Sequence, residues 1–317
     1  LRWIRSCSAS LPAAVALELE KCFGVPVIEA YGMTEAAHQI ASNPLPPKER
    51  KIGSVGLSTG TEIAVMDDQQ RLLSNGEIGE IVIRGATIIT EYANGGEIGQ
   101  DNFPGGWFRT GDQGYLDKDG YLYLTGRLKE IINRGGEKIS PKEIDDLLLG
   151  HPEIAQAGAF RVPHPTLGDD VAVALVLRPG SQLKESSVRE YMLERLAEFK
   201  VPSRVFILDE IPKGATGKLN RSELSARFAR HVFGQGAELK NGLEEKVAGI
   251  YREVLSVENI GSSDNFFELG GDSIRATQVI NRVRALFQVN LSMAVVFRKP
   301  TVFELAAEIA QMTGNVN

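Results

Sequence analysis

The sequence of 317 residues predicts a mixed α/β and α+β region followed by a small all-helical domain. Three observations predict this. Strand-like and helical segments are mixed from residue 1 to about 230, the apolar pattern lapses at 231–242, and beyond that linker apolar residues recur at helical spacing. With 43% hydrophobic and 24% charged residues, the chain is long enough for two or three independent cores.

Several short segments of the first region have the pattern of strands. Residues 1–4 form a strand-like run, 25–30 are mainly apolar, 79–85 alternate with a period of two between glycines, and 171–177 are rich in β-branched residues. Residues 141–149 are expected to be a helix, because Ser140 can cap it and Pro141 fits its first turn.

The helices of the last domain are predicted from their apolar faces. A small bundle follows if these faces pack together. The three faces consist of Leu243, Val247, Ile250 and Val254; of Val279, Ile280, Val283 and Leu286; and of Val302, Leu305, Ala306 and Ile309 within 301–312.

Bulk properties exclude some classes of function. A net charge of -6 argues against general binding to nucleic acid or to a membrane surface. No apolar run approaches the ~20 residues that span a bilayer, and the residues from Leu1 onward do not have a signal-peptide pattern. Cys7 and Cys22 have neither metal-ligand nor disulfide spacing, which favours structural roles, a reducing compartment and hence the cytoplasm. Because residue 1 is not Met, we expect a longer natural chain.

The segment 266–273, Phe-Phe-Glu-Leu-Gly-Gly-Asp-Ser, carries the clearest chemistry. Its two glycines permit a tight turn beside Ser273, which should begin a helix with its hydroxyl exposed. A plain helix cap is the alternative for an isolated Gly-Asp-Ser. Residues 243–310 resemble peptidyl carrier domains, and the resemblance implies that a separate transferase attaches 4'-phosphopantetheine to Ser273.

Five glycine-punctuated motifs occur upstream in a fixed order. The first places a hydroxyl and a carboxylate, Thr34 and Glu35, after an apolar strand, as hard-cation and phosphate chemistry requires. Each motif alone is weak evidence, since a lysine flanked by glycines is usually a solvated loop residue. The motifs are Tyr-Gly-Met-Thr-Glu at 31–35, Trp-Phe-Arg-Thr-Gly-Asp at 107–112, Gly-Arg-Leu-Lys-Glu at 126–130, Asn-Arg-Gly-Gly-Glu-Lys-Ile-Ser-Pro at 133–141 and Pro-Lys-Gly-Ala-Thr-Gly-Lys at 212–218.

Together these motifs resemble the adenylate-forming superfamily of acyl-CoA ligases, luciferases and peptide-synthetase adenylation domains, over residues 1 to about 228. The resemblance implies that Thr34 contacts the nucleotide phosphate, and that Glu35 holds Mg²⁺. Asp112 and Arg127 would then bind the ribose of ATP or AMP. Lys218 would bridge the substrate carboxylate and the α-phosphate during adenylation.

The same resemblance implies further roles. Lys129 would be a hinge, and Gly135 and Gly136 would line the tunnel for the thiol, with a purely structural turn as their alternative. The remaining nucleotide contacts would come from Ser8, Ala9 and Ser10 near adenine, and from Glu29, Ala30 and Tyr31 at a strand end.

The resemblance also implies the fold class and the domain boundaries. We expect an incomplete α/β large domain with a β-rich subdomain at 1–129, and an α+β C-terminal lid at 130–230. After the linker at 231–242, an all-α four-helix carrier bundle would occupy 243–313. The lid would rotate about its hinge between the two half-reactions.

Within the superfamily, residues 5–11, 42–46 and 133–141 look closest to the oxalate–CoA ligase branch, which uses small acids. His38 could then meet a second carboxylate of the substrate, or it could be a helix-face histidine without a ligand.

The function implied is ATP-dependent formation of an acyl-adenylate, followed by transfer to the thiol of the arm on Ser273. The family's phosphate loop has no counterpart in this sequence, so we expect the chain alone not to adenylate and to expose an apolar face. Partners would be a small carboxylic acid, a phosphopantetheinyl transferase and downstream biosynthetic enzymes. The alternatives are a fragment of a free acyl-CoA ligase, with CoA as the acceptor, and a stand-alone carrier loaded by other enzymes.

Overall fold

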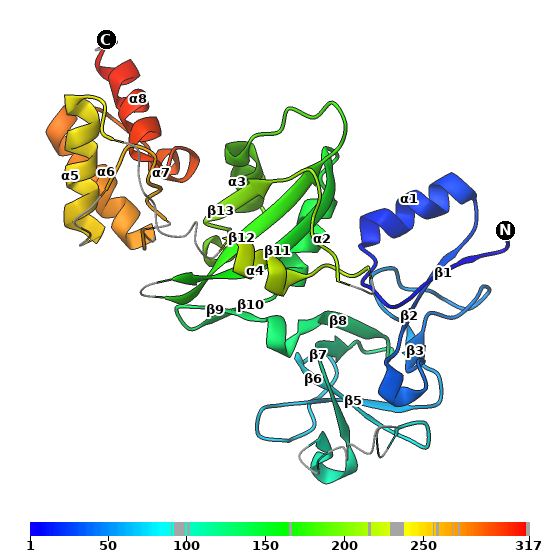
Figure 1. Ribbon diagram of the computed structural model, residues 1–317. Coiled ribbons are helices and arrows are strands. Elements are labelled where there is room, and N and C mark those ends of the chain that lie inside the picture. Colours follow the sequence, from blue (N-terminus) through cyan, green and yellow to red (C-terminus); the bar gives the residue numbers. More distant parts are fainter. Residues whose placement is uncertain are drawn as a thin grey trace. The chain divides into compact units, whose positions relative to one another are not determined.

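The structure is a computed structural model that describes residues 1–89, 91, 99, 102–164, 167–214, 217–228, 238–255, 257, 260–267, 269–271 and 273–314. It consists of two compact units, whose elements are labelled in Figure 1. Unit 1 comprises Leu1–Ile131 and Ser140–Pro152, and unit 2 comprises Ile132–Ile139 and Glu153–Asn317.

A four-stranded sheet opens unit 1. Its strands are β1 (Ile4–Ser6), β2 (Val27–Tyr31), β3 (Ala41–Ser42) and β4 (Leu57–Ser58), and helix α1 (Ala13–Phe23) connects the parallel pair β1 and β2. The predicted strand at 1–4 was placed too early, since only Ile4 belongs to β1. The predicted strand at 25–30 begins at Val27, because Pro26 has no N–H for the ladder, although its carbonyl accepts a hydrogen bond from Ile4.

A second, antiparallel sheet forms the β-rich part of unit 1. Its order is β5 (Glu62–Met66), β6 (Gly79–Arg84), β7 (Phe108–Leu116) and β8 (Leu122–Arg127), which confirms the strand expected at 79–85. Ile81, Ile83 and Leu122 are fully buried in its core. Gly114 permits the close pairing of β7 with β8, because a Cβ there would lie 2.2 Å from the carbonyl oxygen of Tyr123.

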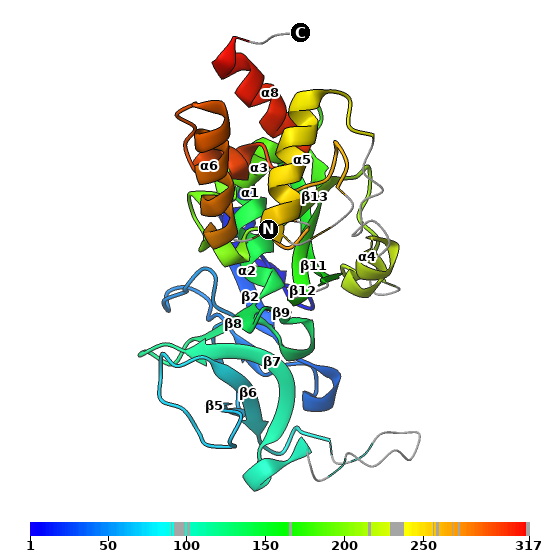
Figure 2. The ribbon, with the colours of Figure 1, turned by 90° about the vertical axis from the view of Figure 1, so that its left-hand side faces the viewer.

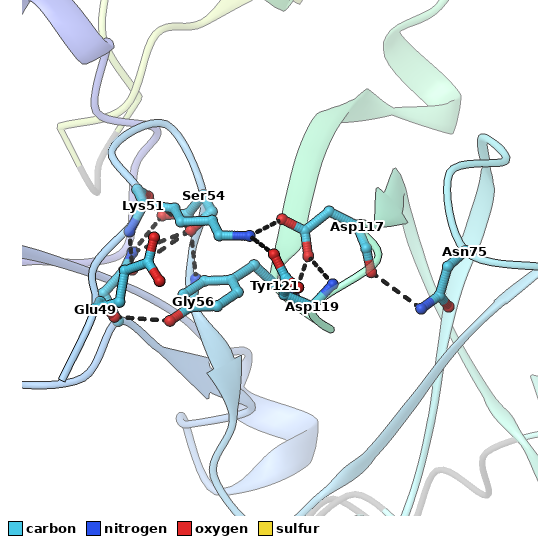
Figure 3. Close-up of polar contacts among 9 residues, drawn as sticks. Glu49, Lys51, Ser54, Gly56, Asn75, Asp117, Asp119 and Tyr121 are labelled. Atoms are coloured by element: carbon cyan, nitrogen blue, oxygen red, sulfur yellow. Dashed lines mark hydrogen bonds and ion pairs between the residues drawn. The ribbon is translucent and has the colours of Figure 1, made fainter.

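A polar cluster ties the loop before β4 to the turn between β7 and β8 (Figure 3). Lys51 Nζ lies 2.5 Å from Asp117 and 2.6 Å from Asp119, and it lies over the Tyr121 ring. The two carboxylates raise the pKa of Lys51 well above its usual range. The Tyr121 hydroxyl donates to the carbonyl of Glu49. The cluster thus fixes two segments that are more than sixty residues apart in the sequence.

Helix α2 (Pro141–Leu149) confirms the predicted helix and belongs to unit 1, with Ile144 and Leu148 fully buried. The prediction that the Ser140 side chain caps this helix is wrong. Ser140 occupies the N-cap position, but its hydroxyl donates to the carbonyl of Thr125 and makes no cap hydrogen bond. Short 3₁₀ helices in unit 1 are η1 (Thr34–Ala36), η3 (Pro104–Gly106) and η4 (Leu128–Glu130).

Unit 2 begins with a five-stranded sheet of order β10-β9-β12-β11, with β13 beside β12. Three phenylalanines on β11, β13 and α4 stack in its core: Phe160, Phe206 and Phe228. Strand β12 confirms the strand expected at 171–177. The elements are β9 (Ile132–Arg134), β10 (Glu137–Ile139), β11 (Ile154–His164), β12 (Gly168–Leu177), α3 (Glu185–Leu193), η5 (Glu198–Lys200), β13 (Arg204–Ile207) and α4 (Arg221–Phe228).

A C-terminal helical domain completes unit 2, and in it α5 and α6 lie side by side in both views (Figures 1 and 2). Its helices are α5 (Gly242–Leu255), α6 (Ser273–Phe287), α7 (Ala294–Arg298) and α8 (Val302–Thr313). They share one apolar core that uses only residues of this domain. Thr301 and Glu304 form a reciprocal capping box at the start of α8.

The expected helical faces of this domain are confirmed except at one position. Leu286 is 54% exposed, and the next residue, Phe287, packs against the core instead. Of the predicted linker, residues 231–237 lie outside the described part of the chain, and Gly242 already belongs to α5. Among the described helices, none combines the length and apolar character needed to cross a membrane.

Gly271 provides a test of packing in the helical domain. A Cβ at this position would lie 2.2 Å from the Phe266 ring, so Gly271→Ala should destabilise the domain by about 1–3 kcal/mol. Gly249 is the matched control, because nothing lies within 4 Å of its Cβ position in α5, and Gly249→Ala should stabilise by about 0.5–1 kcal/mol. Urea unfolding followed by helical circular dichroism measures both; equal effects would refute this packing account.

Candidate functional site

Asp112 is the centre of the polar site in unit 1. Its Oδ2 accepts a hydrogen bond from the Tyr31 hydroxyl at 2.6 Å, and its Oδ1 lies 3.0 Å from Nε of Arg127. Three elements supply these residues: Tyr31 ends β2, while Asp112 and Arg127 face each other across β7 and β8. The structure therefore brings together three of the residues that were predicted to bind nucleotide.

Burial keeps the Tyr31 hydroxyl of this cluster protonated. Tyr31 and Asp112 are both buried, and burial, together with the charge of Asp112, raises the pKa of Tyr31 far above its usual range. The phenol therefore remains a hydrogen-bond donor at every ordinary pH. Since a carboxylate has about four acceptor positions and only two are used here, Asp112 can still accept hydroxyl donors. A ribose offers such donors.

Thr110 supports Asp112 and was missed as a site residue. Its hydroxyl donates to the carbonyl of Ile81 at 2.7 Å and accepts the Asp112 N–H at 3.1 Å. The signal was within the motif at 107–112, because a threonine two residues before an aspartate can anchor the turn between them.

The loop predicted to lie near adenine is connected to β2 by a half-buried carboxylate, that of Glu29. Glu29 accepts the N–H of Leu11 at 3.1 Å, and burial raises the pKa of Glu29. Ser8 has a left-handed backbone with φ 74°, and Ser8, Ala9 and Ser10 are exposed. Ala30 is buried in the strand. The loop therefore presents its polar groups to solvent directly beside the strand that ends at Tyr31.

The residues after β2 form a compact turn. Gly32 is required there, since a Cβ would lie 1.9 Å from the His38 carbonyl oxygen. Thr34 and Glu35 start η1, with Thr34 exposed and Glu35 half-buried. The combination of a hydroxyl, one carboxylate and the oxygens of a bound phosphate is a donor set that Mg²⁺ accepts.

His38 does not lie on a helix face, which was one of the two interpretations of this residue. It follows Ala37 in a left-handed turn, with φ 60°, and its N–H donates to the Met33 carbonyl at 2.9 Å. Its side chain is exposed. The turn thus places an imidazole four residues beyond Thr34 and accessible to a ligand.

Lys218 lies in unit 2, in a turn that precedes α4. The Gly214 N–H donates to the Lys218 carbonyl at 2.8 Å, and Gly217 adopts a left-handed backbone with φ 75°. The Lys218 side chain is exposed. Lys129, also exposed, lies in η4 of unit 1, two residues before the division between the units.

Gly135 and Gly136 form the turn of the β9–β10 hairpin. Both have positive φ angles, 61° and 98°, that favour glycine, and both are exposed. Arg134 holds this turn and was missed as a site residue: its Nε lies 2.8 Å from Asp170, and its Nη1 donates to the carbonyls of Phe199 and Val201. Those partners are distant in sequence, so no local motif could indicate them.

Ser273 is the first residue of α6, as predicted. The turn before it is closed by the Gly271 N–H, which donates to the Phe266 carbonyl at 2.9 Å, and by Arg275, which donates to the Gly270 carbonyl at 2.6 Å. These two hydrogen bonds hold Gly270 and Gly271, which lie just before the proposed attachment residue.

The hydrogen bond between Tyr31 and Asp112 can be tested directly. Tyr31→Phe leaves a buried carboxylate oxygen without its donor, so it should lower the free energy of unfolding of unit 1 by about 1–3 kcal/mol. Tyr123→Phe is the control, because this half-buried ring stacks on Tyr115 and its change should stay within about 0.5 kcal/mol. Tryptophan fluorescence during urea unfolding reports on unit 1, which contains both Trp3 and Trp107. Similar losses in the two variants would contradict the assignment.

Comparison with protein families identifies the family of this chain. Residues 1–93 match the AMP-binding enzyme model, 143–218 match the AMP-binding enzyme C-terminal domain, and 245–309 match the phosphopantetheine attachment site. The chain belongs to the AMP-binding enzymes. Its helical domain is of the type that carries a phosphopantetheine attachment site, so the resemblance inferred from the motifs is confirmed.

Individual relatives agree with this family. The chain is 50% identical over 233 residues to a probable CoA ligase CCL9 of Humulus lupulus, covering 73% of this chain and 44% of the relative. It is 47% identical over 232 residues to an oxalate–CoA ligase of Saccharomyces cerevisiae, covering 73% and 43%. The chain thus spans less than half the length of these curated relatives.

A solved structure resembles nearly the whole chain. The McyG A-PCP structure, complexed with phenylalanyl-adenylate, matches with a TM-score of 0.68 and 26% identity, and the match covers 98% of this chain and 54% of that chain. The joined organisation of an AMP-binding region and a carrier-type domain therefore has a structural counterpart.

Proposed function

We propose that this chain is part of an ATP-dependent ligase that activates a carboxylic acid as an acyl-adenylate and transfers the acyl group to a thiol on its own carrier domain. One observation supports this above the others: two AMP-binding segments and a phosphopantetheine attachment segment follow one another in a single chain. The proposed boundaries remain 1–129 for the large domain, 130–230 for the lid, 231–242 for the linker and 243–313 for a four-helix carrier bundle.

In the first half-reaction, residues of unit 1 hold the nucleotide. Asp112 accepts the ribose hydroxyls, and Tyr31 and Arg127 hold its carboxylate in place. Thr34 contacts the phosphate and Glu35 holds Mg²⁺. The metal supplies positive charge to the phosphate oxygens when it is bound.

Lys218 supplies a further positive charge to the acid and the α-phosphate. The acid oxygen forms a bond to the α-phosphorus, and the bond to pyrophosphate breaks, so negative charge accumulates where the ammonium group lies. In the second half-reaction a thiolate forms the thioester and AMP leaves. Lys129, close to the division between the units, acts as the hinge, and the Gly135–Gly136 turn leaves room for the arm of Ser273.

A small acid is the proposed substrate. The chain is 47% identical to enzymes named oxalate–CoA ligase in yeast and in Arabidopsis thaliana. The exposed imidazole of His38, four residues after Thr34, would meet a second carboxylate of such an acid. A phosphopantetheinyl transferase would modify Ser273, and downstream enzymes would take the acyl group. The cytoplasm is the proposed location, consistent with the free thiols of Cys7 and Cys22.

Free CoA is the second candidate acceptor, because the curated relatives are named CoA ligases. Two products distinguish the candidates. Acyl transfer to the carrier adds mass to the protein, whereas transfer to CoA leaves the protein mass unchanged and gives a soluble thioester.

The experiment uses a chimera in which this chain follows the N-terminal half of the yeast oxalate–CoA ligase. After modification by a transferase, the chimera receives ATP, Mg²⁺ and a panel of small mono- and dicarboxylic acids. We expect acid-dependent exchange of pyrophosphate into ATP, and a mass gain confined to the peptide with Ser273. If acyl-CoA is the sole product, free CoA is the acceptor. If Ser273 is acylated only when other ligases are added, the carrier is a stand-alone domain loaded by other enzymes.

A further inference from the structure

Unit 2 contains an apolar cavity of about 380 Å³ beside the turn that leads to Ser273. Leu193 at the end of α3 and Phe199 and Pro202 after it line one side, and Phe267 and Phe297 of the helical domain line the other. Every residue that lines it belongs to unit 2. The cavity therefore exists without any residue of the nucleotide site in unit 1.

The helical domain contacts the rest of unit 2 around this cavity. Helix α3 packs against α7, and Arg298 Nε of α7 lies 2.8 Å from Glu190 of α3. Phe267 and Phe297 stack on each other, with ring centroids 4.9 Å apart. Because the ion pair is about half exposed, water screens it, and the apolar contacts must supply most of the attraction.

The position of Gly271 connects the cavity with the attachment residue. Gly271 lies in the cavity wall, and α6 begins two residues later at Ser273. Its lack of a side chain is enforced by Phe266, whose ring leaves no space for a Cβ. Gly135, which also lines the cavity, has no side chain either. The wall therefore presents bare backbone at Gly271, two residues before the point where the arm would start.

The lining selects a neutral and largely apolar occupant. Arg134, the cation next to Gly135, already contacts Asp170 and the carbonyls of Phe199 and Val201. Arg189 donates to the carbonyl of Ser203. These guanidinium groups are engaged with the protein. The remaining wall is mostly aliphatic and aromatic, with Glu198 and Ser203 as its other polar residues. The pantetheine chain, which consists of alkyl segments joined by amides, has this character, whereas a nucleotide or an inorganic anion does not.

We propose that the cavity is a resting site for the pantetheine part of the arm on Ser273, separate from the site of acyl transfer. This inference rests on the proposed function, because it requires that Ser273 carries the arm. In the resting state the arm lies between the helical domain and the segment 193–203, and its thiol is shielded from solvent.

The test measures the reactivity of that thiol, and not the activity of the enzyme. Cys7 and Cys22 are the only cysteines, so Cys7→Ser and Cys22→Ser leave the arm thiol alone. The chain is modified with CoA and a transferase, and the rate of alkylation by a maleimide attached to a large polymer is recorded. If the site is occupied about nine-tenths of the time, alkylation is about tenfold slower than in the helical domain 238–317 made alone. We expect this domain to fold by itself, because its core uses only its own residues.

Four substitutions make the test specific. Leu193→Trp fills the cavity and should raise the rate to that of the isolated domain, whereas Leu286→Trp, at an exposed position outside the cavity wall, should not. Glu190→Arg should also raise the rate, and adding Arg298→Glu should restore protection by re-forming the ion pair with reversed charges.

Two results would overturn the inference and differ in their meaning. If Ser273 is modified but the parent chain, Leu193→Trp and the isolated domain react at equal rates, the resting site is refuted while the proposed function stands. If Ser273 gains no mass, both are refuted.

Discussion

Replacing Lys218 by Ala in the chimeric ligase should lower the rate of acyl-adenylate formation by about two to three orders of magnitude. In the role proposed for Lys218, its ammonium group would stabilise the negative charge that develops as an acid oxygen approaches the α-phosphate. A preorganised cation is worth much more in the transition state than in the ground state, so kcat should fall more than KM rises. The rate is measured as acid-dependent pyrophosphate exchange.

Lys213 is the matched control for this prediction. It lies in the same exposed turn, where it pairs with Leu219 across an isolated bridge, and no role in the reaction is assigned to it. Lys213→Ala should leave the exchange rate within about twofold, because an exposed charge at a distance is screened. The thiol-transfer half, started from preformed acyl-adenylate, should be much less affected by Lys218→Ala. Equal losses in both lysine variants, or in both half-reactions, would contradict the role of Lys218.

The second large effect concerns Ser273. Ser273→Ala should abolish attachment of phosphopantetheine and with it all acyl loading of the protein, because it removes the hydroxyl at the start of α6 that is proposed to take the arm. Acyl-adenylate formation in the chimera should remain unchanged, because Ser273 is not among the residues proposed to bind the nucleotide or the acid. Ser292→Ala is the control, because Ser292 is exposed and precedes a helix of the same domain. It should accept the arm like the parent.

Local patterns predicted much of the fold. The alternation at 79–85 became β6, and the apolar faces around Val247 and Leu305 became the buried faces of α5 and α8. The predictions were wrong where a residue outside the local pattern determines the position or the hydrogen bond of a side chain. The Ser140 hydroxyl finds the Thr125 carbonyl instead of its own helix, and Leu286 is displaced from the core by Phe287.

The candidate site, too, could be predicted only in part from local motifs. Motifs were sufficient to select Asp112 and Arg127, which face each other on neighbouring strands. They could not indicate that Tyr31, 81 residues earlier, donates to Asp112, because that contact depends on the packing of two sheets. The contacts of Arg134 could not be predicted from motifs either, since its partners Asp170 and Phe199 come close only when the sheet of unit 2 folds.

The central claim is that this chain carries its acyl group on Ser273, and intact mass tests it most directly. The chain is incubated with CoA and a broad phosphopantetheinyl transferase beside Ser273→Ala and Ser292→Ala. We predict a gain of one phosphopantetheine in the parent and in Ser292→Ala, and no gain in Ser273→Ala. No gain in the parent, or an equal gain in Ser273→Ala, would contradict the claim and leave a fragment of a free acyl-CoA ligase as the better account.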